Sequence, residues 1–193
     1  MPISYFVIAI VLVLVAAFVA FEYRVRQPDV LVLFESKGKI GLRSGLMYPR
    51  HFSLVIKRTT TPIHLTVDAA AAGNLGVNVK LVGSVVPALD NIQTLIRVGG
   101  WSSEAISRVS EETGILLEGL VKEYTETAEI NALSSTGLTK YLNERANMFQ
   151  EKFGVELISL AVQSLEPTDP EIADALRQQE QARLLGQTER LNN

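Results

Sequence analysis

The sequence predicts an α+β protein in which one membrane-spanning helix precedes a folded domain. Three observations lead to this prediction. Residues 3–21 contain no charged side chain. Residues 30–87 hold short segments in which apolar and polar residues alternate, which is typical of half-buried strands. From residue 102 onward the apolar residues recur mainly at helical spacing, interrupted by one late strand at 155–165.

Composition limits the classes of function. The chain has 193 residues, a formal net charge of −3 and a pI of about 5.5. Nucleic acid is not expected as a partner, because such proteins need a dense cluster of Lys and Arg to neutralise phosphates. The chain has no cysteine, which excludes disulfides, thiol nucleophiles and Cys-ligated metal centres. The length fits one domain in addition to the membrane segment.

The apolar run at 3–21 is predicted to cross a membrane. At 1.5 Å per residue it reaches about 28 Å, close to the thickness of the hydrocarbon core. Two alternatives are a cleaved signal peptide, with residues 15–17 as the cleavage site, and a buried core helix. The first lacks a basic leader, and the second needs more surrounding protein than the chain offers. The residues expected to span the bilayer include Ile3, Phe6, Ile10, Leu14, Phe18 and Phe21.

The charges that flank this run predict its orientation. Residues 1–4 carry no basic side chain, whereas Arg24, Arg26, Lys37 and Lys39 follow the run. Because basic residues favour the cytoplasmic side, we expect a single-pass protein with its N-terminus outside and its domain in the cytoplasm.

The first half of the domain is expected to be antiparallel β structure. Pro62 limits its strand to a strand start or a sheet edge, because proline has no N–H to donate. A hairpin turn is expected at 73–76, and Pro87 should end the following strand. The expected strands cover residues 30–34, 39–43, 52–56, 63–67 and 77–86.

Two packed helices should follow. A serine pair at 102–103 can cap the first, whose apolar stripe runs through 106–124. A second pair at 134–135 can cap the next, expected as one helix with a stripe through 138–153. Gly154 is a typical residue after a helix C-terminus.

The chain then predicts a strand and a closing helix. The strand covers 155–165. Asp169 suits the N-cap position and Pro170 the first helical position, so a new helix should begin there. Positions 172–186 form a poor heptad seam, so this helix is expected to be either the start of a longer element or an arm that needs a partner.

Catalytic chemistry is not expected, and no catalytic, cofactor-binding or metal-binding residue is assigned. His64 and Asp68 would share one face of a strand but have no third ligand nearby. A metal-dependent enzyme using this pair is kept as a remote alternative. His51 lies in a loop and is given no role. The glycine tracts at 38–41 and 73–76 lack the Lys-Ser/Thr of a phosphate-binding loop.

The order of these parts resembles the stomatin, prohibitin, flotillin and HflK-C group, also called the SPFH or Band 7 family. The matching stretches are 28–34, 73–87 and above all 153–180, where a helix-ending glycine, a strand, a proline-containing turn and Glu-Ile-x-x-Ala-Leu-x-x-Gln-Glu follow one another. The resemblance implies a transmembrane anchor at 1–22, an SPFH domain at 23–168 and the start of a helical oligomerisation arm at 169–193. The family usually continues into a long coiled coil, which the poor heptad does not match.

The resemblance also implies a function. Such proteins are non-catalytic scaffolds that form membrane-bound rings or cages and organise membrane microdomains. The alternative within this fold is an adaptor or regulator of a membrane AAA+ protease or channel. The expected partners are the lipid bilayer, further copies of this chain and a membrane-protein client. Trp101 could equally serve an interface or the core. The residues proposed for self-association are Trp101, Asp169, Pro170, Ile172, Leu176 and Gln179.

Overall fold

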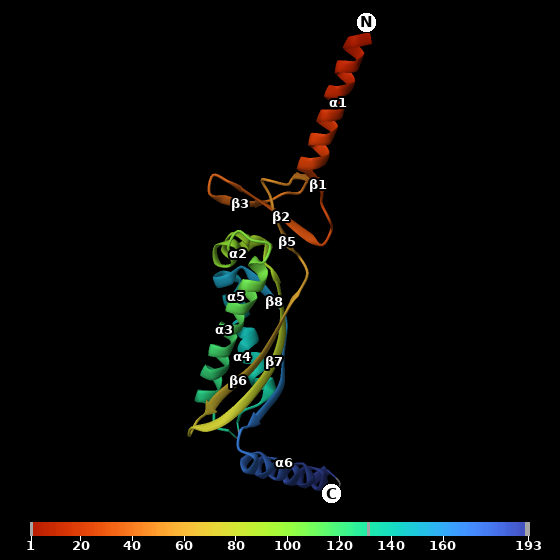
Figure 1. Ribbon diagram of the computed structural model, residues 1–193. Helices are drawn as coiled ribbons and strands as arrows, with labels where there is room; N and C mark the ends of the chain where they lie inside the picture. The colour runs from red at the N-terminus through yellow and green to blue at the C-terminus, as the bar shows by residue number, and fades with distance from the viewer. Residues whose placement is uncertain (1, 131, 192–193) are drawn as a thin grey trace.

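The computed structural model describes residues 2–130 and 132–191 as a mixed α+β fold with antiparallel sheets. Helix α1 (Pro2–Glu22) projects from one end of the folded body, and α6 (Pro170–Leu191) leaves from the other end (Figure 1). The predicted class, α+β with one N-terminal apolar helix, is confirmed.

The part of the body next to α1 contains two small antiparallel sheets. One pairs β1 with β4, and in the other β2 lies between β3 and β5. The strands are β1 (Tyr23–Val25), β2 (Val30–Ser36), β3 (Lys39–Leu42), β4 (Met47–Pro49) and β5 (Leu54–Lys57).

One strand expectation in this region is wrong at its start. Phe52 was expected on the strand that became β5, but it lies in the preceding turn with 75% of its surface exposed. The chain reverses here because the Arg50 amide donates a hydrogen bond to the Glu22 carbonyl (2.7 Å), which ties residues 50–53 to the end of α1.

The larger sheet has the order β6–β7–β8 and is antiparallel throughout (Figure 1). Its strands are β6 (Thr61–Ala71), β7 (Leu75–Pro87) and β8 (Val155–Pro167). Strand β6 is an edge strand with Pro62 near its start, as predicted. The β6–β7 turn is tighter than expected and covers residues 72–74, because Gly73 and Asn74 both adopt positive φ angles of 87° and 63°.

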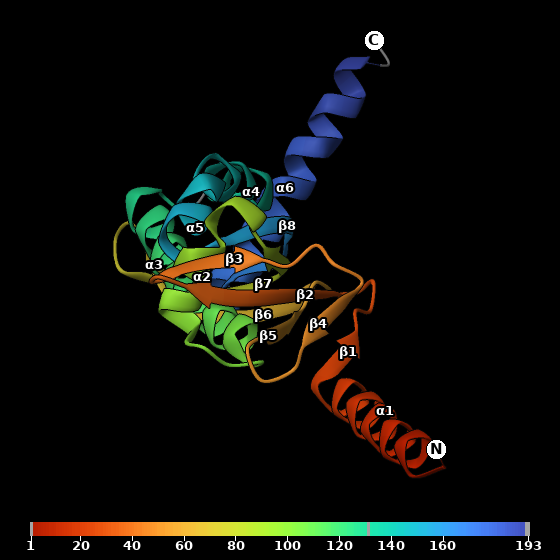
Figure 2. The same cartoon turned by 90° about the horizontal axis from the view of Figure 1, so that it is seen from above.

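Helices α3, α4 and α5 lie against this sheet, whereas α1 and α6 project away from the body (Figure 2). Helix α3 packs on β6, while α4 and α5 pack on β8. The short helices η1 and α2 connect β7 to α3. Their bounds are η1 (Leu89–Asn91), α2 (Ile92–Gly99), α3 (Ala105–Thr127), α4 (Ser135–Glu144) and α5 (Ala146–Phe153).

The helix predictions need three corrections. Helix α2 was not predicted. The N-cap residue of α3 is Glu104 and makes no side-chain capping bond. The Ser102 hydroxyl, two residues earlier, accepts a bond from the Glu104 amide (3.2 Å). The second predicted helix is two helices, because Arg145 leaves helical geometry (φ −101°, ψ 6°) and redirects the chain so that Phe149 reaches the core.

Both predicted boundaries of this helical pair hold. The Ser134 hydroxyl accepts a bond from the Gly137 amide (3.0 Å) at the start of α4. Gly154 ends α5 in the left-handed conformation. One apolar core joins the small β2–β5 sheet to the large sheet and its helices. Its fully buried members include Leu33, Ile56, Leu81, Leu117, Leu142 and Phe149.

Candidate membrane anchor and association surfaces

Helix α1 is long and apolar enough to cross a membrane, and none of the stretch Tyr5–Glu22 is buried. The predicted spanning residues that can be assessed are exposed, with Phe6 at 68% and Phe18 at 65%. The side chain of Ile3 lies outside the described part of the structure. This exposure contradicts the core-helix alternative, because the folded body covers no side of α1. A signal sequence would satisfy the same criteria of length and composition.

Contacts with a distant loop bind the end of α1 to the body. The Glu22 carbonyl accepts a bond from the Arg50 amide, and the Glu22 carboxylate is hydrogen-bonded to Nδ1 of His51. The Phe21 and His51 rings lie 6.1 Å apart, and the Arg50 guanidinium lies 6.0 Å from the centre of the Phe21 ring. The sequence analysis missed this role of His51. No local pattern could have revealed it, because Glu22 and His51 are 29 positions apart.

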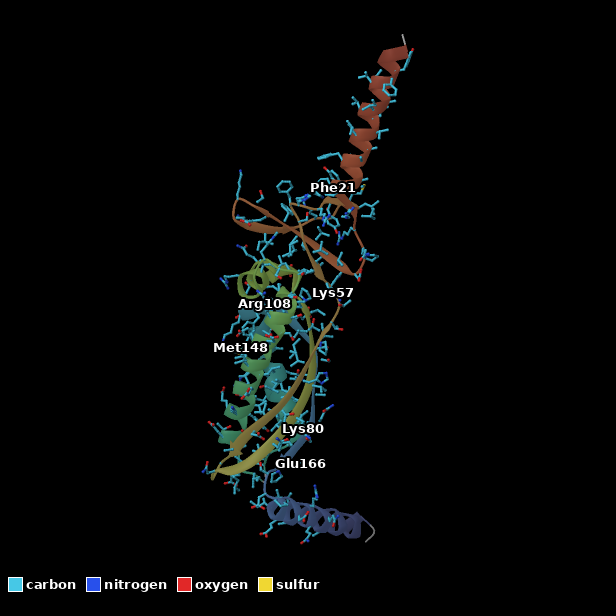
Figure 3. The ribbon with its side chains drawn as sticks, viewed as in Figure 1. Phe21, Lys57, Lys80, Arg108, Met148 and Glu166 are labelled. Atoms are coloured by element: carbon cyan, nitrogen blue, oxygen red, sulfur yellow. The ribbon has the colours of Figure 1, made fainter. Side chains whose placement is uncertain are left out.

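Around this junction lies a segment pair that we call the collar, defined as residues 23–26 and 43–53. It consists of β1, β4 and the loops beside them, and it sits at the base of α1 (Figure 3, where Phe21 is labelled). Four arginines occur in the collar and no Asp or Glu. Its exposed large hydrophobic side chains are Tyr23, Val25, Leu46, Met47 and Phe52.

The opposite end of the body carries α6. The Asp169 carboxylate accepts a bond from the Glu171 amide (2.9 Å), and Pro170 is the first helical residue, so the predicted helix start is confirmed. Ile172 and Leu176 lie four residues apart and are half-buried. The side chain of Gln179 lies outside the described part of the structure.

Trp101 and α6, both proposed for self-association, do not lie on one common surface. It is 46% exposed in the loop between α2 and α3, so the core reading of this residue is wrong. This loop lies beyond the end of the large sheet where Pro87 pairs with Val155, whereas α6 follows the end where Val77 pairs with Pro167. The 13 residues of β8 separate the two ends by about 43 Å.

His64 and Asp68 lie on the exposed face of β6, as their alternation predicts. The Asp68 carboxylate accepts a bond from the Asn78 amide group of the neighbouring strand (2.7 Å). Among the side chains that the structure describes, no group of three or more His, Asp or Glu residues lies close enough to hold a metal ion. Farther along this face, the Ser84 and Ser159 hydroxyls are 2.7 Å apart, so cross-strand polar pairs occupy it.

A shallow groove of 780 Å³ is lined by residues of α4 and β8. Leu160 and Val162 line one side, and Thr139 and Asn143 line the other. Its two charged residues, Lys140 and Glu144, come from one helix. This lining offers hydroxyl, amide and apolar contacts to a ligand.

One titratable group has a clear structural role. Burial raises the pKa of the Tyr141 phenol, and the neighbouring Glu123 raises it further. The Tyr141 ring lies 5.2 Å from the ring of Tyr124 and 3.6 Å from the Arg145 guanidinium. Both effects on the pKa favour the neutral form of Tyr141, whose ring packs α4 against α3.

Comparison with known proteins adds no assignment to these surfaces. No family model matches the chain, and no curated protein matches it in sequence.

Proposed function

We propose that this chain is a single-pass membrane protein that assembles side by side with further copies into a non-catalytic scaffold of the SPFH or Band 7 type. The observation that carries the proposal is α1, an apolar helix that the body leaves exposed and whose last turn is bound directly to the folded domain. Such a helix needs an apolar environment, and a bilayer supplies it.

Two further features support lateral assembly. Strand β8 is an edge strand of 13 residues, and edge strands offer backbone groups to a partner. Helix α6 extends away from the body (Figure 2), and most of its described side chains between residues 170 and 182 are exposed. Membrane anchoring confines copies to two dimensions, which raises their effective concentration, and contacts repeated by rotation close into rings. The order of elements agrees with the SPFH resemblance.

Anchoring is tested by extracting membranes at alkaline pH and weighing the intact chain. We expect the protein to stay in the membrane fraction with residues 2–22 still attached. A mature protein that lacks these residues and is found in the soluble fraction would instead establish a signal peptide and overturn the proposal.

Self-association is tested by the native mass in mild detergent, where one chain contributes 21.2 kDa. We expect a multiple of this mass. The double variant Ile172→Ser/Leu176→Ser should reduce it, because both side chains share one face of α6. The matched control Asp174→Asn/Arg177→Gln removes an exposed ion pair on the same helix, in which a guanidinium nitrogen of Arg177 lies 3.3 Å from a carboxylate oxygen of Asp174. This control should keep the large native mass. A monomeric wild-type chain would contradict self-association, and a stoichiometric foreign partner would favour the adaptor function.

The proposed orientation places the folded body in the cytoplasm. Because the chain has no cysteine, Lys80→Cys creates one reactive thiol on the exposed face of the large sheet (Figure 3). A membrane-impermeant maleimide should label this thiol in opened cells and leave it unlabelled in intact cells. Labelling in intact cells would reverse the orientation.

A further inference from the structure

The collar combines exposed apolar side chains with exposed arginines at the base of α1. Its exposed apolar side chains are large, and both Leu46 and Phe52 have 75% of their surface exposed. Phe52 projects from the turn whose Arg50 and His51 contact the end of α1, and Leu46 projects from the loop whose carbonyl accepts a bond from the Arg26 amide (2.8 Å). Exposed apolar side chains therefore lie beside the base of the helix. A cluster of this kind in water marks a binding surface.

The charge of the collar is opposite to that of the whole chain. The chain carries 21 acidic and 18 basic residues. In the collar, by contrast, four arginines occur and no Asp or Glu. Arg26 and Arg43 are half-buried and serve the fold, since Arg26 binds the Arg43 carbonyl (3.0 Å) and Arg43 lies over the Phe34 ring. Arg24 and Arg50 are exposed, and they bring positive charge to the surface around α1.

The contacts with α1 set the height of the collar relative to a bilayer. Arg24 reaches back along the helix and donates to the Ala20 carbonyl (3.1 Å). On the other side, the Glu22 carbonyl accepts from the Arg50 amide (2.7 Å). The 21 residues of α1 span about 32 Å, close to the hydrocarbon thickness, so Arg24 and Arg50 lie at the level of the lipid headgroups.

We infer that the collar docks on the bilayer surface and selects anionic phospholipids. Arg24 and Arg50 bind the lipid phosphates, and the side chains of Leu46 and Phe52 enter the headgroup–acyl boundary. Arginine suits this task because its planar guanidinium matches phosphate oxygens with two parallel hydrogen bonds. An acidic protein partner is less suited, because it would leave the apolar side chains beside the membrane helix in water. The inference rests on the proposed membrane anchoring by α1.

The test uses the full chain with a single cysteine, Phe52→Cys, that carries an environment-sensitive dye. The protein is reconstituted into vesicles of phosphatidylcholine alone and into vesicles in which phosphatidylglycerol replaces part of this lipid. Nitroxide-labelled lipids should quench the dye more strongly when phosphatidylglycerol is present. The dye at Lys80→Cys, on the sheet, should be unquenched in both. Leu46→Cys gives a second reporter if the dye at position 52 disturbs the loop.

Removing charges then distinguishes specific binding by the two collar arginines from a general attraction between basic residues and an anionic membrane. The double variant Arg24→Gln/Arg50→Gln should lower the equilibrium constant for docking of the collar on phosphatidylglycerol vesicles on the order of tenfold, because each basic residue near an anionic surface favours binding. Lys57→Gln/Arg58→Gln removes the same charge from exposed residues below the collar and should leave docking unchanged (Lys57 is labelled in Figure 3).

The outcomes that overturn the inference are distinct from failure of the anchor. Dyes at 46 and 52 that are as unquenched as the dye at 80, in a protein that resists alkaline extraction, would refute the collar and leave the anchor standing. Equal quenching in the two lipid mixtures would refute anionic selectivity. Extraction of the protein from the vesicles would refute the anchor itself.

Discussion

Phe149→Ala is expected to lower the free energy of unfolding by about 3–5 kcal/mol. Phe149 lies in α5 and has no exposed surface. It belongs to the apolar core that joins the helices to the small β2–β5 sheet and to the large sheet. Its removal loses buried apolar area and leaves a cavity that the surrounding strands and helices can close only in part. Domains of this size are stable by about 5–15 kcal/mol, so the variant should be severely weakened.

The measurement is urea unfolding of the full chain in mild detergent, followed by circular dichroism. Ile115→Ala is the control, because truncation of an apolar side chain that is 65% exposed and lies outside the collar should change the stability by less than about 0.5 kcal/mol. Similar losses in the two variants would contradict the position of Phe149 in the core.

Gly154→Ala is expected to cost about 2–5 kcal/mol. Gly154 has a φ angle of 69°, and an alanine in this left-handed conformation costs about 1–2 kcal/mol. The added Cβ would also collide with the carbonyl oxygen of Asn91 and the backbone nitrogen of Leu95. These are backbone atoms that cannot rotate away, so the junction between α5, β8 and α2 must shift.

Gly119→Ala is the control for this glycine and should change the stability in the opposite direction. Gly119 lies inside α3, and nothing approaches its added Cβ within 4 Å. Alanine should therefore stabilise the helix by up to about 1 kcal/mol. Unfolding in urea distinguishes the two variants by the sign of the change. A destabilised Gly119→Ala or a neutral Gly154→Ala would show that the packing around α3 or α5 differs from that described.

Local signals account for the parts of the fold that were predicted well. A helix N-cap, a C-terminal glycine and a tight turn each depend on residues within a few positions of one another. Asp169 with Pro170, Ser134 and the Gly73–Asn74 turn were therefore visible in the sequence. The break at Arg145 was not visible, because the apolar spacing of α4 and α5 continues across it.

The composition of residues 3–21 and the short-range patterns determined the N-terminal apolar helix, the β-rich half and the helices that follow. Only the tertiary structure decided which distant segments meet: Glu22 with His51, β7 with β8, and the collar with the end of α1. It also placed Trp101 and α6 at opposite ends of the large sheet. The reason is physical, since periodicity reports which face of an element is buried, whereas the path of the whole chain decides what that face is buried against.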